Sequence, residues 1–143
     1  MIAVARANAR AAGLDLRFKP VGFGSLNKTF GSGSFGAILC LGNSLPHLLT
    51  PADLAQALSD FANCLTPGGK LILQNRNFDA VLANRSRWME PETYVEGDRE
   101  WVFQRFYDFE TDGLIRFNIV TLTRQAGKDW QSSLTATHLR PQT

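Results

Sequence analysis

The chain has 143 residues, of which 44% are hydrophobic and 20% charged, a globular composition that excludes an intrinsically disordered chain. Its formal net charge is +2 and its Lys and Arg residues form no run, which argues against a nucleic-acid or membrane surface. No apolar segment reaches membrane-spanning length, and no signal peptide is recognised. Cys40 and Cys64 lack metal-ligand spacing, which predicts reduced thiols, no metal site and a cytoplasmic location.

The first 36 residues predict a helix, a strand and a glycine-rich connection. Residues 2–12 are rich in Ala and Arg and end at Gly13, which is typical of a helix with a glycine C-cap. Residues 14–18 alternate apolar and charged side chains, which indicates a strand. Residues 22–36 are glycine-rich and contain a literal G-x-G-x-x-G at residues 31–36. We reject a dinucleotide-binding loop there, because such a loop must follow a strand and open a helix, whereas these glycines lead into a strand.

An apolar run followed by a polar loop, residues 35–49, organises the rest of the chain. Residues 35–41 are typical of a strand buried on both faces of a parallel sheet. Polar or flexible residues follow at once: Gly42, Asn43, Ser44 and His47. Because ligands bind outside the carboxyl ends of strands in open α/β sheets, this loop is a candidate binding site. The same residues also suit an ordinary turn, and this alternative stays open.

The next element is a helix with a clear start signal. Thr50 suits the N-cap, Pro51 suits the first helical position, and Asp53 completes a capping box. Four apolar residues at helical spacing are expected to form one buried stripe: Leu54, Leu58, Phe61 and Leu65.

A second short strand is expected at residues 71–73, after residues 67–69 (Pro-Gly-Gly) end the helix. The order strand, helix, strand predicts an α/β architecture with parallel strands for residues 1–84. Residues 85–143 have a different pattern and predict an appended antiparallel β meander. Its strands are expected at residues 101–109, 114–124 and 132–139, with turns at residues 111–113 and 127–129.

Three stretches resemble class I S-adenosylmethionine-dependent methyltransferases, and more narrowly the glycine N-methyltransferase-like branch. Residues 35–48 resemble the fourth strand and its loop, residues 65–71 the entry to the fifth strand, and residues 74–79 the Arg-Asn-aromatic-Asp segment at its end. The Leu-Gly-Asn-Ser-x-x-His stretch followed by Arg-Asn-Phe-Asp is the most specific part. The resemblance implies an incomplete Rossmann-like methyltransferase fold, S-adenosyl-L-methionine as cofactor, and methyl transfer to a small amine or amino acid.

The resemblance also implies roles for individual residues. Asn43 and Arg76 are the expected catalytic residues, with Arg76 binding the acceptor's carboxylate through its planar donor fork. The expected cofactor-binding residues are Met1, Gly22, Phe23, Leu41, Gly42, Ser44 and His47. Structural alternatives stay open, since Arg76 could form a strand-end ion pair and His47 could cap the next turn.

The sequence also departs from the family pattern. The family's first strand, glycine-rich cofactor loop and acidic ribose-binding residue would lie before Met1, and a last helix and two strands would follow residue 141. Gly36 stands where the family usually has Asp. We therefore expect an internal methyltransferase segment whose bare strand edge pairs with a second copy or a complementary segment. The alternative is a non-catalytic remnant that acts through association.

Overall fold

The computed structural model describes residues 1–142. These residues form two compact units, and the division cuts through the first two strands and the longest helix. One unit comprises Met1–Ile38 and Ala55–Leu71, and the other comprises Leu39–Leu54 and the chain from Ile72 onward. The residues that follow the first two strands therefore belong to the second unit.

Helix α1 (Ile2–Ala11) ends as the sequence predicts. Gly13 has φ +68°, the left-handed conformation that glycine adopts without steric cost. The Gly13 N–H donates to the carbonyl of Arg10 at 3.0 Å, and the Leu14 N–H donates to that of Ala9 at 2.9 Å. These two bonds form a Schellman motif, which satisfies the last carbonyl groups of the helix.

The prediction of a strand at residues 14–18 is wrong. This segment is irregular, and Leu14 and Leu16 are each 55% exposed. A strand needs a neighbour for its N–H and C=O groups, and none of the described strands pairs with these residues. Alternation alone therefore did not produce a strand.

The glycine-rich connection contains a short helix, α2 (Leu26–Phe30), that the sequence did not predict. Its first N–H groups are bound by a side chain 34 positions away, that of Asp60. The carboxylate oxygens accept from Leu26 N at 2.6 Å and from Asn27 N at 2.9 Å. The expectation that residues 31–36 lead into a strand is confirmed, because β1 (Phe35–Cys40) begins there.

Helix α3 (Pro51–Cys64) begins where the capping residues predict. The Thr50 hydroxyl oxygen accepts from Asp53 N at 3.1 Å. Its buried stripe differs from the predicted one and consists of Ala57, Phe61 and Cys64, while Leu58 is 36% exposed. Of the four predicted residues only Phe61 is buried, because the buried face of α3 is turned towards Ala57, Asp60 and Cys64 and leaves Leu58 outside it.

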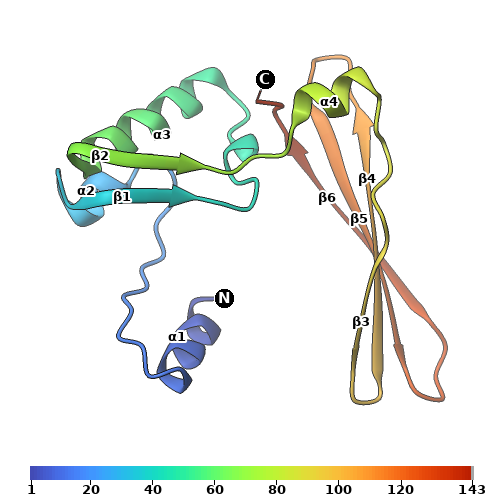
Figure 1. Ribbon diagram of the computed structural model, residues 1–143. Helices are drawn as coiled ribbons and strands as arrows, with labels where there is room; N and C mark the ends of the chain where they lie inside the picture. Colours follow the sequence, from blue (N-terminus) through green and yellow to red (C-terminus); the bar gives the residue numbers. More distant parts are fainter. Residues whose placement is uncertain (143) are drawn as a thin grey trace. The chain divides into compact units, whose positions relative to one another are not determined.

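Strands β1 and β2 (Leu65–Leu73) form a two-stranded sheet, and Figure 1 shows both arrows pointing the same way, as predicted for a parallel pair. β2 is longer than expected, because residues 67–69 lie within it. β1 is not buried on both faces: Leu39 is 59% exposed, and only Cys40 is buried. The rest of the described chain leaves most side chains of β1 uncovered, and β1 has a single neighbour, β2, among the described strands.

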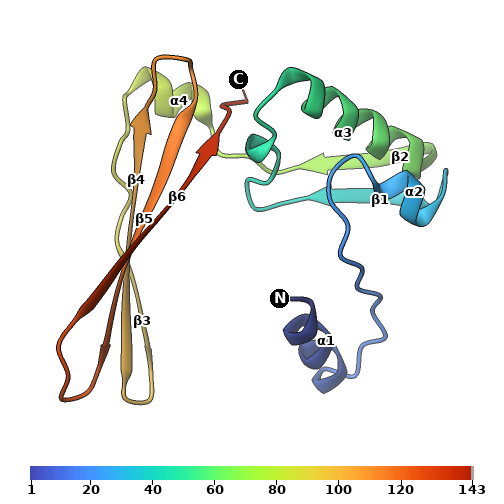
Figure 2. The same cartoon turned by 180° about the vertical axis from the view of Figure 1, so that it is seen from behind.

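The second unit contains an antiparallel sheet of four strands (Figure 1, Figure 2). In spatial order these are β3 (Glu92–Glu96), β4 (Arg99–Phe109), β5 (Ile115–Gln125) and β6 (Gln131–Leu139). The three predicted strands of the meander are confirmed within two residues at each end, and β3 is an addition. No helix among residues 1–142 is long and apolar enough to cross a membrane.

A short helix, α4 (Phe78–Ala83), connects β2 to this sheet and was not predicted. Phe78 and Val81 are buried, with 1% and 4% of their surface exposed. They pack with Tyr107, Ile115 and Leu139 in the hydrophobic core of the second unit. The helix therefore anchors the end of β2 on the sheet.

Candidate functional site

Two polar segments meet at the carboxyl ends of β1 and β2. Residues 41–47 follow β1, and residues 74–77 follow β2. The side-chain oxygen of Asn43 accepts a hydrogen bond from the backbone N–H of Arg76 at 3.0 Å. The structure therefore brings together Asn43 and Arg76, the two residues that the sequence singles out as catalytic.

The loop after β1 has an unusual backbone. Gly42 and Asn43 both have left-handed conformations, with φ +72° and +60°. Asn is among the few residues with a side chain that tolerate this region. A Cβ built on Gly42 would meet no atom within 4 Å, so space is open on that side of the backbone.

Ser44 and His47 shape the end of this loop. The Ser44 hydroxyl donates to the carbonyl of Leu41 at 2.7 Å, which tightens the turn. The 3₁₀ helix η1 (Leu45–His47) follows, and His47 N donates to Ser44 O at 3.2 Å. The His47 residue is exposed, so its ring is accessible from outside.

The position of η1 is fixed by the end of β6. Leu45 and Pro46 are buried, and Pro46 O accepts a hydrogen bond from Arg140 N at 2.7 Å. The Arg140 side chain also donates to the carbonyl of Leu49. These bonds connect parts of the chain more than ninety positions apart and hold the loop after β1 against the meander.

Arg76 is exposed, and its guanidinium group rests on uncharged neighbours. Its central carbon lies 5.7 Å from the ring centroid of Tyr107, and Nη1 lies 3.9 Å from the Met89 sulfur. No carboxylate pairs with Arg76 among residues 1–142. The strand-end ion pair that was the structural alternative is therefore not found in the described part of the chain.

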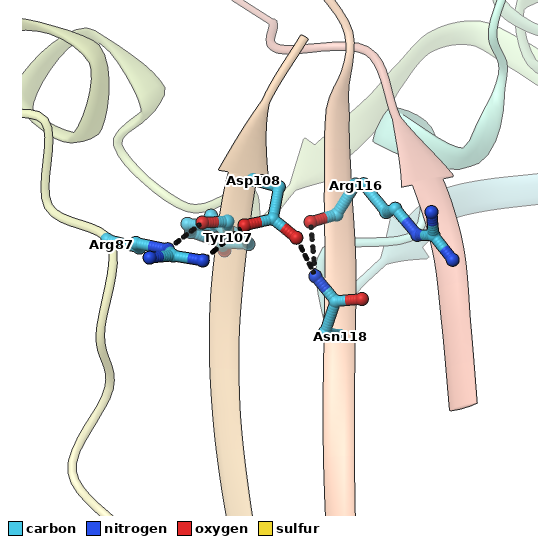
Figure 3. A network of polar contacts seen from close by, with 5 residues as sticks. All are labelled: Arg87, Tyr107, Asp108, Arg116 and Asn118. Carbon is cyan, nitrogen blue, oxygen red and sulfur yellow. Dashed lines mark hydrogen bonds and ion pairs between the residues drawn. The ribbon is translucent and has the colours of Figure 1, made fainter. Parts of the chain in front are cut away.

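The neighbours of Arg76 are held by a polar network that Figure 3 shows from close by. Arg87 pairs with Asp108 at 2.6 Å and donates through Nε to the carbonyl of Tyr107 at 3.2 Å. The second oxygen of Asp108 accepts from the amide of the buried Asn118 at 2.9 Å. This network fastens the segment that carries Met89 to β4.

Burial raises the pKa of the Tyr107 hydroxyl, while the positive charge of Arg76 acts in the opposite direction. Tyr107 is 2% exposed, so its ring is held by the surrounding core and supports the guanidinium group of Arg76. Burial also raises the pKa of the Cys40 thiol, which makes this cysteine a weak nucleophile.

Three of the expected cofactor-binding residues, Met1, Gly22 and Phe23, belong to the first unit. The Phe23 ring packs edge-on against Phe61, with ring centroids 6.0 Å apart. Gly22 and Met1 are exposed. The sequence predicts that Phe23 and the loop after β1 share one cofactor pocket, and this stays a prediction because the two lie in different units.

Sequence reasoning missed three residues that shape the site. Gln74 bonds the loop after β1, and Met89 and Tyr107 support Arg76. Gln74 had a weak signal, since it directly follows an apolar strand. Met89 and Tyr107 lie 13 and 31 positions after Arg76, and no local pattern connects them to it.

The structure also tests whether S-adenosylmethionine suits these residues. Open space beside Gly42 and a 50% exposed Leu41 leave room for an extended ligand along the loop. The Oδ1 atom of Asn75, next to Arg76, is buried without a hydrogen-bond partner among the described residues. An unpartnered acceptor of this kind is unusual in a folded chain and suits a ligand's ammonium group.

The chain is similar to known methyltransferases, in agreement with the resemblance found in its sequence motifs. The family described as "Methyltransferase domain" matches residues 1–69. The glycine/sarcosine N-methyltransferase of Halorhodospira halochloris is 37% identical over 117 residues, which are 82% of this chain and 42% of that protein. The enzyme of the same name from Parasynechococcus marenigrum is 38% identical over 86 residues, which are 60% of this chain and 30% of that protein.

The solved structures give the fold. An S-adenosylmethionine-dependent methyltransferase from Clostridium acetobutylicum superposes with TM-score 0.71 at 19% identity, covering 97% of this chain and 53% of that one. The predicted resemblance to methyltransferases is confirmed by the family match and by the relatives of similar sequence. An S-adenosylmethionine-bound amino pentose methyltransferase from Micromonospora echinaspora gives TM-score 0.63 at 20% identity, covering 98% of this chain and 56% of that one.

These matches confirm the Rossmann-like methyltransferase fold. The chain spans about two fifths of the length of the Halorhodospira relative and about half of the two solved chains.

Proposed function

We propose that this chain forms the acceptor side of an S-adenosylmethionine-dependent N-methyltransferase whose substrate is a small amino acid with a free carboxylate. The relatives named as glycine/sarcosine N-methyltransferases support this acceptor class. The observation that carries the proposal is the Arg76 guanidinium, which is exposed, has no carboxylate partner among residues 1–142, and lies beside Asn43.

The proposed chemistry needs positioning more than proton transfer. The bound cofactor would supply an electrophilic methyl group on sulfur. Arg76 would hold the acceptor's carboxylate in a bidentate pair. Asn43 already accepts from Arg76 N through Oδ1, so its NH₂ group is free to donate to a ligand. Holding an amine in line with the methyl group can account for a large part of the rate.

The cofactor contacts are proposed for the residues that the resemblance singles out. Leu41, Gly42, Ser44 and His47 lie on one loop of the second unit, which supports a shared role. Met1, Gly22 and Phe23 lie in the first unit and are proposed to contact the adenosine part.

The direct test uses the purified protein. Calorimetric titration with S-adenosylmethionine should show saturable binding. Incubation with the methyl-labelled cofactor should transfer label to glycine or sarcosine but not to methylamine, which lacks the carboxylate. Absence of cofactor binding would contradict the proposal, and equal labelling of methylamine would contradict the acceptor class.

Arg76→Lys tests the role of the guanidinium. Lysine keeps the charge but loses the bidentate fork, so KM for the amino acid should rise about tenfold, the effect of about 1.4 kcal/mol. The affinity for S-adenosylmethionine should stay nearly unchanged. Arg124→Lys is the matched control, because Arg124 pairs with Glu100 on the meander. An equal loss of cofactor affinity in Arg76→Lys would make this residue structural or cofactor-linked.

A further inference from the structure

Gln74 is the first residue after β2, and it forms three hydrogen bonds: one to the last residue of β1 and two to the loop that follows β1. Its backbone N–H donates to Cys40 O at 2.9 Å, and its carbonyl accepts from Asn43 N at 3.1 Å. Its side-chain oxygen Oε1 accepts from Gly42 N at 3.0 Å. The first two bonds belong to the backbone of any residue at this position, whereas the third depends on the glutamine side chain.

The third bond acts on the part of the loop with the least common backbone. Gly42 and Asn43 are consecutive left-handed residues, a conformation that leaves their N–H groups outside any regular ladder. Gln74 accepts from both N–H groups, one with its side chain and one with its backbone. The side-chain bond therefore holds the Gly42 peptide group in one orientation. The backbone direction at Asn43 depends on that orientation.

Asn43 passes this constraint on to Arg76, because its side-chain oxygen accepts from Arg76 N at 3.0 Å. Gln74 and Arg76 are two positions apart at the end of β2, and Asn43 bonds to both. Hydrogen bonds thus connect the loop after β1 to the segment after β2 and fix their relative positions. They join Gly42 and Asn43 to Gln74, and Asn43 to Arg76.

We propose that Gln74 is a positioning residue for the acceptor site, and that it acts through the acceptor oxygen of its side chain on the Gly42 amide. This inference rests on the proposed function for its catalytic consequence. The chemistry requires an oxygen at this place and no donor. Glutamate can therefore replace glutamine, whereas methionine, which has a similar length and no acceptor oxygen, cannot.

The experiment compares Gln74→Met with Gln74→Glu, and Gln125→Met is the matched control. Gln125 bonds Asp98 across the far turn of the meander and touches none of the site residues. The first measurement is hydrogen exchange of the Gly42 amide by NMR without any ligand. Loss of one hydrogen bond of about 1 kcal/mol predicts exchange about fivefold faster in Gln74→Met. Gln74→Glu and Gln125→Met should exchange as the wild type does.

The second measurement is kcat/KM for the amino-acid acceptor. In Gln74→Met this kcat/KM should fall about fivefold, whereas in Gln74→Glu it should stay close to the wild-type value. A role of Gln74 in packing alone would not produce this difference. Unchanged Gly42 exchange in Gln74→Met, or equal losses of kcat/KM in the Met and Glu variants, would overturn the inference. If the wild type transfers no methyl group, the proposed function fails, and the Gly42 exchange rates alone then decide whether Gln74 holds this loop.

Discussion

At the scale of single residues, Arg76 and Tyr107 are coupled through charge and burial. The guanidinium carbon lies 5.7 Å from the Tyr107 ring centroid. Burial raises the pKa of the Tyr107 hydroxyl, and the nearby positive charge lowers it, so the two influences oppose each other. The titration of Tyr107 therefore reports where the Arg76 charge lies, whether or not the protein is active.

Replacing Arg76 with methionine should raise the pKa of Tyr107 further, because the charge that stabilises the tyrosinate is removed. The measurement is the tyrosinate absorbance in a Tyr94→Phe background, which leaves Tyr107 as the only tyrosine. Tyr107 should titrate above the ordinary value of about 10. Arg124→Met should leave its titration unchanged, and a lowered pKa in Arg76→Met would contradict the geometry.

The same shift makes stability depend on pH. The folded-state pKa of Tyr107 lies above the unfolded value, so the stabilisation from its protonated form is complete below about pH 10. It is lost as pH rises through the folded-state pKa. The free energy of unfolding by urea should fall over this alkaline range, and it should fall less in Tyr107→Phe.

The proximity of Asn43 and Arg76 has a physical reason that the sequence already contains. Asn43 and Arg76 follow strands that are expected to be parallel neighbours, and the ends of such strands meet at one edge of a sheet. The bond from Gly42 to Gln74 and the contact of Arg76 with Tyr107 could not be read this way. They depend on side-chain rotamers and on the packing of the meander, which residue order does not specify.

At the scale of elements, the sequence predicts those helices and strands that depend on local signals. It does not predict those that depend on partners far away in the chain. The hairpins between β4, β5 and β6 carry their own alternation and turn residues, and their register follows from neighbouring positions. Helix α2 depends instead on Asp60, which lies on α3. A helix of five residues is too short to form by itself, so its cause lies outside its own sequence.

Asp60→Ala should therefore destabilise the protein by about 2 kcal/mol, the upper range for loss of an N-terminal cap. It removes both acceptors of the first α2 amides, on Leu26 and Asn27. Urea unfolding measures the free energy, and hydrogen exchange of the Leu26 amide shows that α2 is the part affected. Asp129→Ala is the control, since Asp129 is exposed in the connection between β5 and β6. Equal effects of both substitutions would show that Asp60 does not cap α2.

At the scale of the whole molecule, compactness groups residues that sequence patterns separate. The change from parallel to antiparallel pairing lies between α4 and β3, near residue 85, where the composition changes. Yet Leu39–Leu54 forms a compact unit with the chain from Ile72 onward. The bond between Arg140 and Pro46 is one cause, and it spans too many positions for any periodicity to reveal it.

The open side of β1 leads to a prediction about association. Only one edge of β1 is paired among the described strands, so its other edge presents free N–H and C=O groups. Apolar side chains lie on the same small sheet with large exposed fractions: 59% for Leu39, 50% for Ile72 and 42% for Leu73. An unprotected edge beside apolar side chains favours pairing with a second copy.

Sedimentation velocity of this chain should therefore show species larger than a monomer whose fraction rises with concentration. Leu39→Lys should shift the distribution towards monomer, because a lysine on an edge strand is costly to cover with another strand. Leu14→Lys is the matched control, since Leu14 is 55% exposed but lies in an irregular segment. A wild-type monomer at every concentration would refute the pairing. If Leu39→Lys and Leu14→Lys dissociated the chain equally, apolar exposure in general would be responsible, and the edge of β1 would not be the interface.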